Sequence, residues 1–192
     1  MRRNRDFIGP AGMGGTVALW GASSLIKSIQ YGTVTATGSL TGTATITAVV
    51  LANSVVMYLG NRTTDTSAAL GRIQSRLDLT NTTTVTCTSR DAVATKTVSF
   101  AVLEFAPGMV KSLQTGTVNI TTGELSKNAT ITAVNTNKAF LVWNNQDSNT
   151  ASQNDQAFST LILLNTTTVT VQGGAVQSGG NVTTAYTVLE FF

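Results

Sequence analysis

The sequence predicts an all-β protein made of two tandem six-stranded antiparallel units, each a β-sandwich or flattened barrel, behind an extended N-terminal arm. Three observations predict this fold. Four blocks of the 192-residue chain occur twice in the same order, and Thr, Val and Ile dominate both copies. Turn residues interrupt these runs roughly every ten to fifteen residues, and no amphipathic helical period of useful length is present.

The repeat determines the predicted domain organisation. The paired blocks are 26–34 with 110–118, 44–49 with 129–134, 79–86 with 163–170, and 102–105 with 188–191. Partners are offset by 84 to 86 residues, which composition alone does not produce, so we infer a tandem duplication. We expect an arm over 1–24, one unit over 25–106 and a second over 107–192. Units of this size have only a marginally sufficient core, so packing together or oligomerising would help.

Residues 1–24 show no period of either kind. Glycine and proline over 9–15 disfavour both helix and regular strand. The segment nevertheless carries apolar side chains that a purely disordered tail would not need: Phe7, Ile8, Met13, Leu19 and Trp20. We expect an arm that orders by lying on a partner or a neighbouring subunit, and the alternative is a disordered tail.

Strands are expected at 27–37, 42–50, 54–60, 71–80, 83–89 and 96–105, and again at 111–121, 127–134, 138–144, 156–164, 167–172 and 182–191. The second strand of each unit alternates Ala or Ile with Thr, which predicts one buried face. The third and last strands are apolar on both faces, which is typical of central strands or of strands that face a partner. The polar loops 61–70 and 145–156 are expected at the surface.

The fourth strands distinguish the two units. Their outward faces read Arg72, Gln74, Arg76 and Asp78 in the first unit and Gln156, Phe158, Thr160, Ile162 and Leu164 in the second. Three large apolar groups stand where the sister unit is polar, and burying each would contribute roughly 1.5–3 kcal/mol. We predict that Phe158, Ile162 and Leu164 pack against another unit or another chain.

Composition argues against an enzyme. The chain is 42% apolar and only 11% charged, against roughly 25% charged in an ordinary domain, so either the surface is neutral and polar or much of it is covered in an assembly. There is no histidine and one cysteine, Cys87, which excludes imidazole-based zinc sites and Ser-His-Asp or Cys-His nucleophiles. No cofactor is expected, a net charge of +3 is too small to indicate nucleic acid, and no apolar run is long enough for a membrane helix.

Two carboxylates occur at equivalent places, Glu104 and Glu190, each just before a Phe. A paired acid–base role would need them within a few ångströms of each other across a cleft. Their occurrence once per unit favours a structural role, with the equally duplicated Lys27 and Lys111 as candidate partners.

The repeated motifs carry a family resemblance. They are the Lys-Ser-Ile/Leu-Gln-x-Gly-Thr-Val opening at 27–34 and 111–118, the Ala-Thr-Ile-Thr-Ala-Val strand at 44–49 and 129–134, the Asn-Thr-Thr-Thr-Val-Thr run at 81–86 and 165–170, and the Val-Leu-Glu-Phe close. They resemble a β module of tailed-bacteriophage virion structural proteins, and the size and strand number resemble the sandwich of H-type lectin domains.

The resemblance implies a non-enzymatic virion protein whose partners are the major capsid protein or other virion subunits. We expect a capsid decoration, or cement, protein on the outer surface of the head, assembled as a homo-oligomer. A trimer of two-unit chains would present pseudo-sixfold symmetry that suits a capsid lattice. The alternative is a tail, adaptor or fibre-associated protein that recognises host carbohydrate, with Tyr31, Tyr58, Trp143 and Tyr186 as candidate stacking residues.

Overall fold

The computed structural model describes residues 25–64, 73–90, 92, 95–149 and 156–192. Over these residues the chain is all-β, as predicted, and every strand pairing is antiparallel. The first repeat contains β1 (Ile26–Ala36), β2 (Thr41–Thr45), the 3₁₀ turn η1 (Leu51–Asn53), β3 (Ser54–Thr63), β4 (Arg76–Asn81), β5 (Thr84–Thr88) and β6 (Lys96–Phe105). The second contains β7 (Val110–Ile120), β8 (Ser126–Thr130), β9 (Ala139–Ser148), β10 (Ser159–Asn165), β11 (Thr168–Gly173) and β12 (Val182–Phe191).

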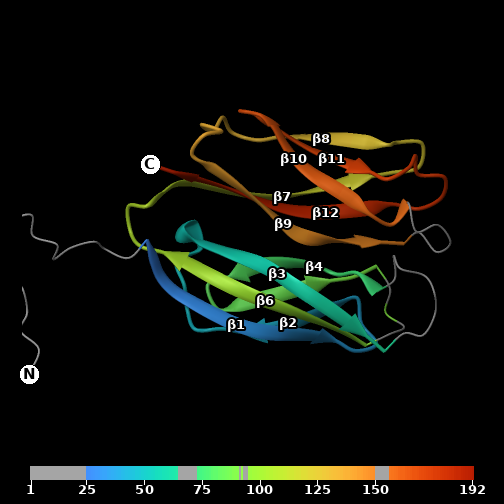
Figure 1. Ribbon diagram of the computed structural model, residues 1–192. Coiled ribbons are helices and arrows are strands. Elements are labelled where there is room, and N and C mark those ends of the chain that lie inside the picture. Colours follow the sequence, from blue (N-terminus) through green and yellow to red (C-terminus); the bar gives the residue numbers. More distant parts are fainter. Residues whose placement is uncertain (1–24, 65–72, 91, 93–94, 150–155) are drawn as a thin grey trace, which may run out of the picture.

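Each repeat forms a sandwich of two three-stranded sheets. In the first repeat the inner sheet has the order β1-β6-β3 and the outer sheet β2-β5-β4. In the second the inner sheet is β7-β12-β9 and the outer sheet β10-β11-β8. Figure 1 shows one sandwich above the other, with β9 and β12 of the second repeat next to β3 and β4 of the first. Among the described residues, every strand of a sheet belongs to the same repeat as its neighbours.

Three apolar cores hold the layers together. One fills the first sandwich and includes Val34, Leu77 and Phe100, and a second fills the other sandwich and includes Ile120 and Val188. The third lies between the two inner sheets. The central strands β6 and β12 are therefore largely buried on both faces, whereas the edge strand β1 exposes Ile29 and Tyr31 on its outward face.

The two repeats share local devices as well as strand order. Gly32 lies opposite Phe100 in the β1–β6 register, and Gly116 lies opposite Tyr186 in the β7–β12 register. In each case a Cβ on the glycine would come within 2.6 Å of the facing aromatic side chain. The glycines are needed because the aromatic rings lie across the neighbouring strand at these points.

The second strands are shorter than predicted. β2 ends at Thr45 and β8 at Thr130, whereas the alternating pattern predicts strands to 50 and 134. Beyond these ends the backbone bonds only intermittently, as when the N–H groups of Ile46 and Ile131 donate to the carbonyls of Thr83 and Thr167. The alternation of buried and exposed side chains also stops there, because Ala48 and Ala133 are exposed whereas Val49 and Val134 are buried.

The third strands are longer than predicted, because β3 runs to Thr63 and β9 to Ser148. Residues 145–148 are buried against the first repeat, so the expectation of a surface loop is wrong for this part of 145–156. Both strands bulge at the same place, where Gly60 and Asn145 have φ of 140° and 68°. The arm predicted over 1–24, with Phe7, Ile8, Met13, Leu19 and Trp20, lies outside the described residues.

Candidate functional site

The duplicated carboxylates lie in matching pockets of hydrogen bonds. Lys27 Nζ donates to Glu104 Oε1 at 2.8 Å, and Lys111 Nζ donates to Glu190 Oε1 at 2.9 Å. The backbone N–H of Val50 donates to Glu104, and that of Asn135 donates to Glu190, at 3.0 and 2.9 Å. The structure thus brings each Lys–Glu pair together, and each carboxylate joins the first and last strands of its repeat to the segment before the third.

These contacts favour the ionised carboxylates. Burial alone would raise the pKa of Glu104, but the bonds from Lys27, Val50 and Ser28 outweigh it and leave the pKa below its usual value. At Glu190 the N–H of Asn135 and the Lys111 ammonium lower the pKa. Each carboxylate is already occupied by its own lysine and backbone donor, which fits a structural role and leaves neither poised to exchange protons with a substrate.

The contact between the inner sheets is built from equivalent residues of the two repeats. Phe105 meets Phe191 edge to face, with ring centroids 5.3 Å apart, and both stand at the end of the last strand of their repeat. Leu103 and Leu189 belong to the same apolar cluster. Contacts between equivalent positions are typical of an isologous interface, so the repeats pack as a dimer packs about a two-fold axis.

A buried ion cluster interrupts this two-fold pattern. The wholly buried Asp147 of β9 accepts hydrogen bonds from Arg76 Nη1 and, at 2.8 Å, from Arg90 Nε, both of the first repeat. Arg90 Nη2 also donates to Thr183 Oγ1 at 2.5 Å. Burial raises the pKa of the Asp147 carboxyl, and the two guanidinium groups oppose that rise.

Amide side chains complete the polar part of the contact. Asn145 Nδ2 donates to the carbonyl of Ser75 at 2.8 Å, and Gln146 Nε2 donates to Gln74 Oε1 at 2.9 Å. Three successive residues of β9, Asn145 to Asp147, therefore form hydrogen bonds with residues 74–76, where β4 begins. The arrangement fixes the second repeat against the first by directional bonds as well as by apolar area.

The predicted apolar face of the second repeat is exposed. Phe158, Ile162 and Leu164 are 46%, 43% and 58% exposed, and we call these three residues the β10 face. No described part of the chain covers them, and their packing against another unit or another chain remains a prediction.

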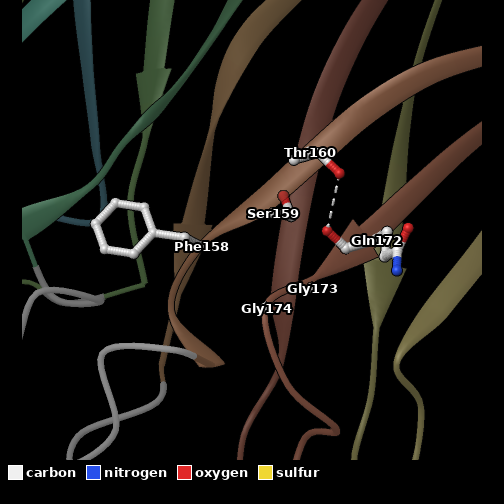
Figure 2. Close-up of a pocket in the computed structure, with 6 residues that line it drawn as sticks. All are labelled: Phe158, Ser159, Thr160, Gln172, Gly173 and Gly174. Atoms are coloured by element: carbon white, nitrogen blue, oxygen red, sulfur yellow. Dashed lines mark hydrogen bonds between the residues drawn. The ribbon is translucent and has the colours of Figure 1, made fainter.

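Figure 2 shows the start of this face beside a shallow hollow of about 360 Å³. The hollow is lined by Phe158, Ser159, Thr160, Gln172, Gly173 and Gly174. The Phe158 ring points away from Thr160, whose hydroxyl donates to the carbonyl of Gln172 at 3.4 Å. No lining residue titrates, so the hollow offers shape and hydrogen bonds without acid–base chemistry.

The described residues contain no cluster of three or more His, Cys, Asp or Glu side chains that could hold a metal ion. Within the same residues, no helix has the length and apolar character that crossing a membrane requires. Cys87 is wholly buried on β5, and burial raises the pKa of its thiol, so the geometry suits a small packed side chain better than a nucleophile.

Comparison of the chain with protein-family models, with curated proteins and with solved structures finds no match.

Sequence reasoning missed the cluster around Asp147. One signal was available: Asp147 aligns with Arg62, and Arg76 aligns with Thr160, so the repeats differ in charge at both positions. An exchange of charges between otherwise matching strands indicates that these positions meet different surroundings. It does not indicate that they meet each other, because that depends on how the two sandwiches pack.

Proposed function

We propose that this chain is a non-enzymatic structural protein of a tailed-phage virion, and that it acts as a capsid decoration protein on the outer surface of the head. In this role it stabilises the shell through contacts with the major capsid protein and with its own copies. The proposal extends the resemblance of the repeated motifs to virion β modules, and it concerns contact area rather than a reaction.

The observation that carries the proposal is the exposed β10 face. Ile162 and Leu164 are exposed on β10, and Phe158 is exposed just before it. The counterpart of this strand in the first repeat, β4, carries Arg76 and Asp78. Exposed apolar groups that gather on one element, in a chain with 11% charged residues, are typical of a surface that is covered in an assembly.

The internal contacts support the same role. One buried carboxylate in each repeat, Glu104 or Glu190, connects the strands of that repeat. The apolar cluster between the repeats and the ion pairs of Asp147 with Arg76 and Arg90 connect the two repeats. A protein that reinforces a shell has to transmit load between its own halves without rearranging. A trimer of such chains would offer six similar units to a hexagonal lattice.

The test is to locate and count the chain in purified virions, by quantitative mass spectrometry and by antibody labelling in electron micrographs. Decoration of the shell predicts many copies spread over the head and a shell that loses resistance to heat when the chain is removed. A few copies confined to one vertex would contradict decoration and support a tail location.

The second candidate, a tail or fibre-associated protein that binds host carbohydrate, has one supporting observation. Tyr31 is 75% exposed on β1, and an exposed aromatic ring can stack on a sugar. The other candidate rings are engaged within the chain: Tyr58 and Trp143 contact each other, and Tyr186 is buried. Saturable glycan binding that is lost in Tyr31→Ala would favour this alternative.

A further inference from the structure

We propose that strand β10 pairs with β10 of a second copy of this chain, antiparallel about a two-fold axis, and joins their outer sheets into one six-stranded sheet. The order of the combined sheet would be β8-β11-β10 followed by β10-β11-β8 of the second copy. The inference deepens the proposed contact role by naming one partner, and it does not depend on where in a virion the chain is found.

The position of β10 is the first observation. Among the described residues it is the last strand of the outer sheet and pairs with β11 along one edge. An edge strand presents a row of backbone N–H and C=O groups that another strand can pair with. At the start of β10 the Ser159 N–H is occupied by Gln146 Oε1 at 3.0 Å, so the available edge begins beyond that residue.

The absence of edge protection is the second observation. Natural edge strands carry charges, proline or bulges that discourage pairing with another chain. The sequence of β10 is STLILLN, without charge, proline or glycine, and its ladder with β11 is regular until the shift between Leu163 and Asn165. The other edge of the same sheet, β8, carries Lys127.

The equivalent strand of the first repeat, β4, is an edge strand that carries charged residues, which discourage pairing with another chain. β4 has Arg76 and Asp78 where β10 has Thr160 and Ile162, and Arg76 is held by Asp147 of the second repeat. The same position on the outer sheet is thus charged and occupied in the first repeat but neutral and open in the second.

The lack of charged side chains around β10 favours a second copy of this chain as the partner of its available edge. Residues 156–189 contain no charged side chain, so two copies of this surface meet without repulsion and without a buried unpaired charge. An antiparallel pair is self-complementary about a two-fold axis, because each strand supplies the donors and acceptors that the other requires. Centred on Ile162, the pairing sets Ile162 against its own copy and Leu164 beside Thr160 of the other chain.

Such a contact joins chains in pairs. In a trimeric decoration protein it would connect neighbouring trimers, while in solution it would connect two free chains. The strand edge would then be covered, and Ile162 and Leu164 would gain cross-strand neighbours on the outward face of the combined sheet.

The test measures the mass of the full chain by sedimentation equilibrium over a wide concentration range. The key variant is Ile162→Asp/Leu164→Thr, which gives β10 the residues that β4 has as Asp78 and Thr80. The matched control is Leu40→Asp, because Leu40 is similarly exposed at 49% but lies in the first repeat.

We expect the wild type and Leu40→Asp to form dimers of twice the 20.0 kDa chain mass. The double variant should remain a monomer, with a dimer dissociation constant at least about 100-fold higher, because two carboxylates would face each other across the axis. The circular dichroism spectrum should match the wild type, since both replaced side chains point outward, and Tm should match at concentrations too low for the wild type to dimerise. An Ile162→Cys chain should form a disulfide-linked dimer on mild oxidation, and Leu40→Cys should not.

A wild type that is monomeric at every concentration would overturn the pairing, and so would a double variant that associates like the wild type. Loss of the dimer on deletion of residues 1–24 but not in the double variant would also overturn it, in favour of the N-terminal segment as the contact. A monomeric chain that still decorates capsids would reject the β10 pairing and leave the proposed function standing.

Discussion

Tyr58 and Trp143 occupy equivalent positions in the two repeats and meet edge to face, with ring centroids 5.7 Å apart. Phe105 and Phe191 are likewise equivalent and meet at 5.3 Å. Contacts between equivalent residues place the repeats about an approximate two-fold axis inside one chain. Asp147 breaks this symmetry, because its equivalent in the first repeat is Arg62. The chain is therefore organised like a homodimer that duplication has joined and later changes have made unequal.

The Phe105–Phe191 contact should be a major source of stability. Phe105 is 6% exposed in the cluster between the inner sheets, so Phe105→Ala should lower the free energy of unfolding by about 3–5 kcal/mol. Urea denaturation followed by tryptophan fluorescence measures this. The neighbouring Phe192 is 69% exposed, and Phe192→Ala should change stability by no more than about 0.5 kcal/mol. Equal effects of the two substitutions would argue against the two-fold packing.

The cross-strand glycines should tolerate no side chain. A Cβ at Gly32 would lie 2.6 Å from Cζ of Phe100, and one at Gly116 would lie 2.5 Å from the Tyr186 hydroxyl oxygen. Both aromatic side chains are buried and cannot move away cheaply, so Gly32→Ala and Gly116→Ala should each cost about 1–3 kcal/mol. Gly179 has open space around it, and Gly179→Ala should leave Tm unchanged or slightly raised. A Gly32→Ala protein as stable as the wild type would place Phe100 elsewhere.

The fold class could be predicted because each strand has a recognisable local sequence pattern and the pattern occurs in both repeats. Alternation of Ala and Ile with Thr predicts a sheet with one buried face, and the repeat shows where one unit ends and the next begins. The Lys27–Glu104 pair could be anticipated for the same reason, since Lys111 and Glu190 recur at the same places. In each case one segment of sequence constrains one element.

The contact between the repeats could not be predicted in the same way. Asp147 looked like a loop residue because polar side chains surround it in sequence, yet residues 146–148 pair with β12 and are buried. The two arginines that neutralise Asp147 lie 71 and 57 residues earlier in the chain. Nothing local indicates such a meeting, which depends on how two finished sandwiches pack.

The two buried glutamates should make stability depend on pH in the acid range. The pKa values of Glu104 and Glu190 are lowered from 4.5 in the folded state. Their contribution is therefore complete above the unfolded value and is lost as the pH falls through the folded values. Tm should fall between about pH 5 and pH 3, and Glu104→Gln/Glu190→Gln should show a lower Tm at pH 7 with a smaller further loss in acid.

Asp78 and Asp147 act in the opposite direction. Burial raises the pKa of each, so their protonation is easier in the folded state and acid favours folding through them. They are present in both proteins of the comparison, and the difference between the two Tm profiles therefore isolates the glutamates. Parallel Tm profiles for the wild type and the double glutamine variant would reject the assignment.

Asp147 should be the residue whose neutralisation most weakens the contact between the repeats. Asp147→Asn keeps the shape of the side chain but removes the carboxylate that Arg76 and Arg90 share, and breaking a buried pair of this kind costs about 3 kcal/mol. Urea denaturation at pH 7 measures the loss. The matched control is Asp78→Asn, which removes the same charge from a side chain that is 38% exposed and 4.0 Å from Arg76, so it should cost less than about 1 kcal/mol. If the two substitutions cost the same, the two arginines find equivalent partners without Asp147, and the ion cluster does not fix one repeat against the other.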